Sequence, residues 1–162
     1  MVKKLGFSLI ELVVVMGLLS LLMLAISSTM LMSIVSSNRI RTTTKVKQAG
    51  NYAITQMQGT IRNAKSISSC IPGSSDASIT LVNPDGDQTQ FILENSQVAS
   101  NSGSYLTPDN LEASLFSVTC EPSATDPTLI KISFSLKSKL ATERQTGNPT
   151  LHFETSVNLR NE

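Results

Sequence analysis

The sequence has few of the residues that most enzymes and metal proteins depend on. It contains one histidine, His152, and two widely separated cysteines, Cys70 and Cys120. One histidine leaves no readable Ser-His or Cys-His pair for nucleophilic catalysis, and this set has no familiar metal-ligand spacing. The sequence also has no Gly-rich phosphate loop. We therefore expect no catalytic residue, no metal site and no cofactor.

Charge of either sign is also scarce. Charged residues make up 15% of the chain, and the formal net charge is +1. A protein that binds nucleic acid through the phosphates needs a strongly basic face. We therefore expect no nucleic-acid partner.

Proline is absent before Pro72, so no residue forces a helix break in the N-terminal part of the chain. A short basic leader, Met1–Leu5, comes first, and a nearly unbroken apolar run reaches Ser37. The segment Leu12–Val35, about 24 residues, would span roughly 36 Å as a helix, which is enough for a ~30 Å hydrocarbon core. The sequence therefore predicts a membrane-spanning helix.

One carboxylate, Glu11, interrupts the apolar run. Such a group costs about 2.5–3.5 kcal/mol at the centre of a membrane helix, so it marks a functional position by default. A secretory signal peptide has a shorter apolar region and a small-residue cleavage site, which Ala25–Ser28 imitates only loosely. A plain signal anchor accounts for the length of the run and leaves Glu11 unexplained.

Residues 6–19 read GFSLIELVVVMGLL. This string resembles the N-terminal signature of type IV prepilins and of the pseudopilins of type II secretion and competence systems. The resemblance implies that a prepilin peptidase/N-methyltransferase cuts after Gly6 and methylates the new N-terminal Phe7. It also implies that Glu11 becomes the fifth residue of the mature chain. The match is local and implies nothing specific about the C-terminal part.

Leader removal would leave the Phe7 amine at the end of an apolar helix. In a bundle of staggered helices an uncompensated Glu11 is costly, whereas pairing with the Phe7 amine of a neighbour neutralises both charges. The partners implied are other pilins or pseudopilins, an inner-membrane assembly platform and the lipid bilayer. The implied location is single-pass in the cytoplasmic (inner) membrane with an extracytoplasmic C-terminal domain, and then a cell-surface or periplasmic filament.

The distribution of basic residues disagrees with this orientation. Four of them follow the apolar run, against Lys3 and Lys4 before it: Arg39, Arg41, Lys45 and Lys47. The positive-inside rule alone would favour the opposite topology. A long C-terminal domain can nevertheless translocate largely regardless of its charges, so we keep the prepilin orientation.

Beyond the membrane-length run the pattern becomes that of an amphipathic helix. Apolar residues recur at steps of three and four, namely Val46, Ala49, Ala53, Ile54, Met57, Ile61 and Ala64. We expect one helix from Phe7 to about Lys65, with a single core-facing stripe in its second half.

Strand patterns follow the helix. We expect strands at Ser78–Val82, Gln88–Leu93, Leu115–Cys120, Leu129–Lys137 and Leu151–Leu159, and loops at Asn95–Asn110 and Ala141–Thr150. The string Asn83–Asp87 predicts a hairpin turn between the first two strands. Four of the five phenylalanines fall on inward faces: Phe91, Phe116, Phe134 and Phe153.

An antiparallel sheet that is wet on one face needs apolar cover on the other, and the amphipathic helix is the apolar partner available. The residues thus predict the α+β class, which agrees with the pilin fold that the resemblance implies. We divide the chain into a leader (1–6), a transmembrane/assembly helix (7–36), its amphipathic continuation (37–67) and an extracytoplasmic sheet domain (68–162).

The role of the cysteines and the exact function stay open at this stage. Cys70 and Cys120 form either a disulfide, permitted outside the cytoplasm, or two buried thiols. The chain lacks the helix proline of many major pilins and their C-terminal cysteine pair, which favours a minor subunit. The alternatives are a DNA-uptake subunit of a competence pilus and a plain signal-anchored extracytoplasmic domain.

Overall fold

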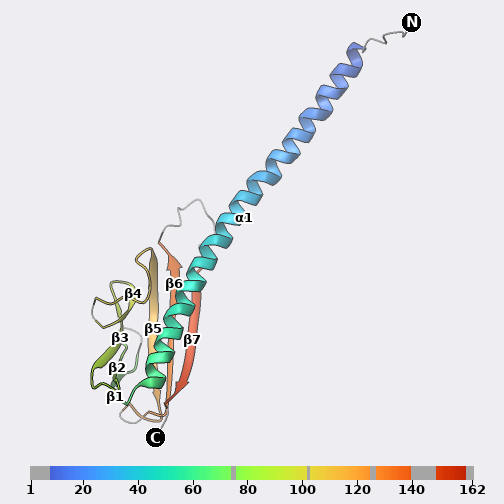
Figure 1. The fold of residues 1–162 in the computed structure, drawn as a ribbon. Coiled ribbons are helices and arrows are strands. Elements are labelled where there is room, and N and C mark those ends of the chain that lie inside the picture. The colour runs from blue at the N-terminus through green and yellow to red at the C-terminus, as the bar shows by residue number, and fades with distance from the viewer. Residues whose placement is uncertain (1–7, 74–75, 102, 125–126, 140–148, 160–162) are drawn as a thin grey trace. The chain divides into compact units, whose positions relative to one another are not determined.

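The computed structural model describes residues 8–73, 76–101, 103–124, 127–139 and 149–159 (Figure 1). Its elements, in chain order, are α1 (Leu9–Asn63), β1 (Ser66–Ile71), β2 (Ser78–Val82), β3 (Gln88–Glu94), β4 (Gln97–Ser100), β5 (Leu111–Glu121), β6 (Leu129–Ser138) and β7 (Leu151–Asn158). The expected leader and cleavage residues Gly6 and Phe7 lie outside the described residues, as does most of the expected loop Ala141–Thr150.

The chain divides into two compact units, residues 1–40 and 41–162. In the first unit the described residues are Ser8 and the first part of α1, whose residues are all exposed. The second unit contains the remainder of α1 and all the strands. The sequence placed the change from membrane helix to amphipathic helix after residue 36, four residues earlier than this division.

The α+β prediction is confirmed, with two antiparallel sheets in place of one. Strands β1-β2-β3-β4 form the first sheet, and β5-β6-β7 form the second. The predicted hairpin joins β2 to β3, where Asp87 N donates to Asp85 Oδ1 over 3.1 Å within the turn. The sheets meet at β5, because Ala113 N donates to the Ser96 carbonyl over 2.7 Å.

Two strands were missed in the sequence. Strand β1 is rich in serine and has little apolar alternation, with the pattern SISSCI. Strand β4 lies inside the segment Asn95–Asn110 that we expected to be a loop. It follows a two-residue turn in which Asn95 and Ser96 have φ values of 51° and 58°, the backbone of a type I′ hairpin. The usual Asn-Gly signal is absent there, so the turn was not recognised.

Strand β5 is also longer than expected, since it begins at Leu111 and not at Leu115. A register shift between Ser114 and Ser117 interrupts its pairing with β6. Within this bulge Leu115 has a φ of 54° and is exposed. The bulge breaks the alternation of buried and exposed residues along β5. Strand prediction relies on this alternation, so the residues before the bulge were not recognised as part of the strand.

The core of the second unit lies between the amphipathic half of α1 and the strands (Figure 1). Val46, Ala53, Met57 and Ile61 supply the helix side, as the spacing predicted. The four phenylalanines expected to face inward are all buried, and the rings of Phe134 and Phe153 stack with centroids 5.5 Å apart. Gln58 of α1 also donates a hydrogen bond to Thr155 of β7.

Candidate functional site

The apolar helix begins at a serine. The Ser8 carbonyl accepts hydrogen bonds from the backbone N–H groups of Glu11 and Leu12, at 3.1 and 3.2 Å. Ser8 thus occupies the N-cap position and Glu11 the third helical position, which is the S-x-x-E spacing of a capping box. From the sequence we expected Glu11 to pair with the Phe7 amine of a neighbouring subunit, and we did not recognise that Ser8 could cap the same helix, although the S-x-x-E spacing is visible in the sequence.

Glu11 is the sole ionisable side chain between Ser8 and Asn38. It is exposed, and its carboxylate has no hydrogen-bond or ion-pair partner among the residues that the structure describes. Its first-turn position lets the helix macrodipole favour its negative charge. The carboxylate can therefore bind a cation supplied from outside the described chain.

The surface around and beyond Glu11 is apolar on every side. Large exposed apolar residues include Leu9, Ile10, Leu12, Val13, Val14, Val15, Met16, Leu18, Leu19, Leu21, Leu22, Met23, Leu24, Ile26, Met30, Leu31, Met32, Ile34 and Val35. By length and composition α1 is the one described helix that could cross a membrane, and its most apolar stretch has no residue buried within the unit. A signal sequence near the N-terminus would share this property, so Glu11 and the leader have to distinguish the two.

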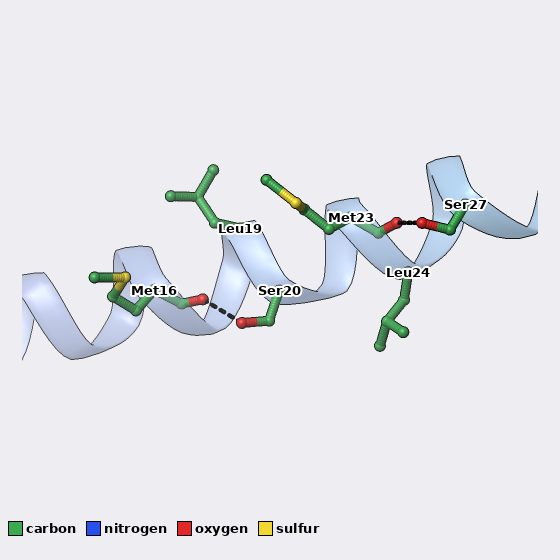
Figure 2. Close-up of a pocket in the computed structure, with 6 residues that line it drawn as sticks. All are labelled: Met16, Leu19, Ser20, Met23, Leu24 and Ser27. Carbon is green, nitrogen blue, oxygen red and sulfur yellow. Dashed lines mark hydrogen bonds between the residues drawn. The ribbon is translucent and has the colours of Figure 1, made fainter.

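Four hydroxyl side chains in this segment, those of Ser20, Ser27, Ser28 and Thr29, donate hydrogen bonds to carbonyl groups of the same helix. Six residues of this segment line a pocket along one stretch of α1 and are drawn in Figure 2: Met16, Leu19, Ser20, Met23, Leu24 and Ser27. The hydroxyl of Ser20 donates to the Met16 carbonyl over 2.7 Å, and that of Ser27 to the Met23 carbonyl over 2.8 Å. A serine whose hydroxyl bonds to the carbonyl four residues earlier can enter apolar surroundings without an unsatisfied donor.

The two cysteines lie in different sheets. Cys70 is on β1 and Cys120 is on β5, and their sulfur atoms are 1.91 Å apart in a disulfide with a Cα–Cα distance of 6.6 Å. The bond therefore links the strand that follows α1 to the three-stranded sheet. Cys120 is only partly buried, whereas Cys70 is buried.

The structure brings one Ser-His pair together that the sequence did not reveal. Ser135 and His152 are register partners on β6 and β7, and Ser135 Oγ lies 3.3 Å from His152 Nδ1. His152 is exposed, as expected, but Ser135 is only 3% exposed. Because the Ser135 side chain is buried, it is poorly placed to attack a substrate. We therefore interpret the pair as a contact between neighbouring strands and not as a catalytic pair. Within the described ranges, no cluster of three His, Cys, Asp or Glu residues could hold a metal.

Comparison with known proteins gives one match. Residues 1–27 match the family model described as the prokaryotic N-terminal methylation motif. No curated protein and no solved structure matches the chain. The matched range covers the leader, Gly6, Phe7 and Glu11 and ends within the apolar half of α1. The N-terminus of this chain therefore carries the type IV prepilin leader signature, which implies a type IV pilin- or pseudopilin-type protein that is processed by a prepilin peptidase and assembles with other pilins.

Proposed function

We propose that this protein is a minor structural subunit of a type IV pilus or of a type II secretion-like pseudopilus. The leader is cut between Gly6 and Phe7, and the mature chain joins the filament through the first half of α1. The observation that carries the proposal is Glu11, the one ionisable side chain in the exposed, apolar first half of α1, whose carboxylate has no partner among the residues that the structure describes.

The assembly step depends on a pair of charges from two subunits. Cleavage creates an amine on Phe7, four residues before Glu11. When apolar helices pack side by side, an unpaired carboxylate is removed from water at a cost of several kcal/mol, and a cation from a neighbour offsets this cost. Removing either partner leaves the other charge buried alone. The pair therefore selects the axial register of neighbouring helices as well as the partner.

The second unit is the extracytoplasmic part of this proposal. The helix crosses the cytoplasmic membrane before assembly, with residues 41–162 outside the cytoplasm, where a Cys70–Cys120 disulfide is stable. Hydroxyl groups that are bonded within α1 suit both the bilayer and a helix bundle. The inner-membrane assembly platform then transfers the subunit from lipid to filament.

A charge-moving experiment tests the role of Glu11. Glu11→Val should still be inserted and cleaved, since it makes the segment more apolar, but its incorporation into filaments should fall at least about tenfold because the Phe7 amine is left unpaired. Leu12→Val, a neighbouring apolar change, is the matched control and should assemble normally. The double variant Glu11→Val/Val15→Glu keeps one carboxylate on the same helix face, one turn later, and should not restore assembly.

Subunit counts by immunoblotting of sheared filaments, normalised to the membrane pool, give the readout. Normal incorporation of Glu11→Val would overturn the pairing mechanism. Full rescue by the relocated carboxylate would show that assembly needs a negative charge in this segment but does not depend on the axial register of the helices.

The minor rank is supported by the sequence features that set this chain apart from many major pilins. It has no proline before Pro72, and its cysteines lie at 70 and 120 with none near the C-terminus. A tip or initiating subunit is needed in few copies and contacts dissimilar neighbours. Quantitative mass spectrometry of purified filaments should therefore find this chain at no more than a few percent of the principal subunit. A filament composed mainly of this chain would contradict the minor rank and make it the structural pilin.

A further inference from the structure

Both tyrosines of the chain lie at the same place on the second unit. Tyr52 is on α1, and Tyr105 follows β4 in the segment that leads to β5. They border one hollow of about 630 Å³, together with Ala49, Gln97, Leu106 and Asp109. Tyr52 is 56% exposed and Tyr105 is 40% exposed. Two aromatic rings from distant parts of the sequence thus face solvent around one concave surface.

Exposed large apolar side chains are uncommon elsewhere on this unit. Among its described residues they are Tyr52, Tyr105, Ile71 and Leu115. Two of the four therefore border the hollow. The described aromatic pair in ring contact is Phe134–Phe153, so the two tyrosine rings are not stacked on each other. Both side chains are partly exposed, so each can contact a ligand with an apolar ring that carries a hydroxyl at its edge.

The hollow is built on a hydrogen-bonded frame. The segment after β4 folds back along that strand: Leu106 N donates to the Val98 carbonyl over 2.8 Å, and Val98 N donates to Thr107 Oγ1 over 3.0 Å. The Asn95 amide donates to the hydroxyl of Tyr105 over 2.9 Å and so orients its ring. A ring held in place before binding loses less conformational entropy when a ligand arrives.

A buried amide supplies polar recognition in the same hollow. Gln97 is only 8% exposed, and its Nε2 donates to the Thr107 carbonyl over 2.6 Å. An amide has two N–H donors and an acceptor oxygen. One donor and the oxygen of Gln97 therefore have no partner among the residues that the structure describes. A group that both donates and accepts, such as a hydroxyl, matches this remaining capacity.

Charge narrows the class of ligand. Among the residues that the structure describes, Asp109 is the only charged residue that borders the hollow, and it is exposed. A carboxylate accepts hydrogen bonds and repels anions, so phosphates, sulfates and acidic sugars are disfavoured. A ligand with an apolar face, several hydroxyls and no negative charge satisfies the tyrosine rings, Gln97 and Asp109 together.

We propose that this hollow, referred to below as the tyrosine hollow, binds a neutral pyranose of a glycan. One ring face of the sugar packs on Tyr52 and Tyr105. Its hydroxyls form hydrogen bonds with the Gln97 amide, and one hydroxyl donates to the Asp109 carboxylate at the edge of the hollow. The proposal goes beyond filament assembly and does not require it, since every residue of the tyrosine hollow lies in the second unit.

The composition of the chain provides a selective probe. It has no tryptophan, and its two tyrosines both border the tyrosine hollow, so intrinsic tyrosine fluorescence reports on this site alone. We would titrate the full-length protein in a detergent without a sugar headgroup. The probes are methyl glycosides of glucose, galactose, mannose and N-acetylglucosamine, and the disaccharides lactose and maltose.

At least one neutral glycoside should give a saturable fluorescence change, with a Kd on the order of 1 mM for a single sugar. Tyr52→Ala should weaken binding at least about tenfold, read from the remaining Tyr105, and Tyr52→Phe should stay within about threefold because the ring is kept. Ile71→Ala, which removes an exposed apolar residue elsewhere, should leave the binding curve unchanged. The circular dichroism spectrum of Tyr52→Ala should match that of the unsubstituted protein, because Tyr52 lies on an exposed face of α1.

Four results would overturn the proposal. The first three are no saturation with any neutral probe, equal binding by Tyr52→Ala, and tighter binding of methyl glucuronide than of methyl glucoside. The fourth is a fluorescence change that follows decaproline or protein concentration and not sugar. A response to decaproline would assign the tyrosine hollow to a peptide, and a response to protein concentration would assign it to a second copy of the chain. None of these outcomes depends on leader cleavage or filament formation, so they leave the proposed function to its own test.

Discussion

Gly50 of α1 and Phe153 of β7 are in direct contact. A Cβ atom at position 50 would lie 2.2 Å from Cζ of the Phe153 ring and 2.3 Å from Cε1, far inside contact distance. The absence of a side chain at Gly50 therefore sets how closely the helix approaches the second sheet. Phe153 is buried and its ring stacks on that of Phe134, so it has little freedom to move away.

This contact predicts opposite effects for two glycine substitutions in the same helix. Gly50→Ala should destabilise the second unit by about 1–3 kcal/mol, because the added methyl overpacks a filled site. Gly59→Ala should stabilise it by about 0.5–1 kcal/mol, since position 59 is exposed with no neighbour within 4 Å, and alanine favours the helix. Chemical unfolding followed by circular dichroism checks both. Equal effects at the two positions would show that the ring does not limit the approach of the helix.

The disulfide predicts a redox-dependent stability. Cys70 and Cys120 are 50 residues apart in sequence, and a loop of this size corresponds to about 4 kcal/mol on the chain-entropy estimate. Cys70→Ser/Cys120→Ser, or reduction of the native protein, should therefore lower the free energy of unfolding by about 2–5 kcal/mol. Intact mass of protein from its native compartment should be two hydrogens below the reduced value. Two thiols that alkylate without reductant would refute the bond.

Much of the fold could be predicted because its signals are periodic. The amphipathic stripe placed Val46, Ala53, Met57 and Ile61 in the core, and alternation placed Phe134 and Phe153 there. The close approach at Gly50 was not visible, because the sequence marks a glycine only as a weak helix former and says nothing about a ring packed on it. The same limit applies to the tyrosine hollow, since no local pattern connects Tyr52 with Tyr105.

Other parts were missed because their local signals were weak or misleading. Strand β4 follows an Asn95–Ser96 turn with positive φ values but without glycine, so polar composition suggested a loop. At Leu115 a bulge turns a large apolar side chain to solvent, which breaks the alternation that strand prediction uses. For the candidate assembly site, Glu11 was evident from sequence because a carboxylate in an apolar run is costly. Its relation to Ser8 required the observed start of the helix.

The central claim is that the apolar half of α1 begins, in the mature protein, at a new N-terminus on Phe7, close enough to Glu11 for the pair to direct assembly. The most direct measurement is N-terminal sequencing with intact mass of the membrane-bound protein from a host with a prepilin peptidase. We predict a chain that starts at N-methylated Phe7, and an uncut chain when Gly6 is replaced by a bulky residue such as leucine. A mature chain that starts at Met1, or one cut near Ser28 as by a secretory signal peptidase, would contradict the account.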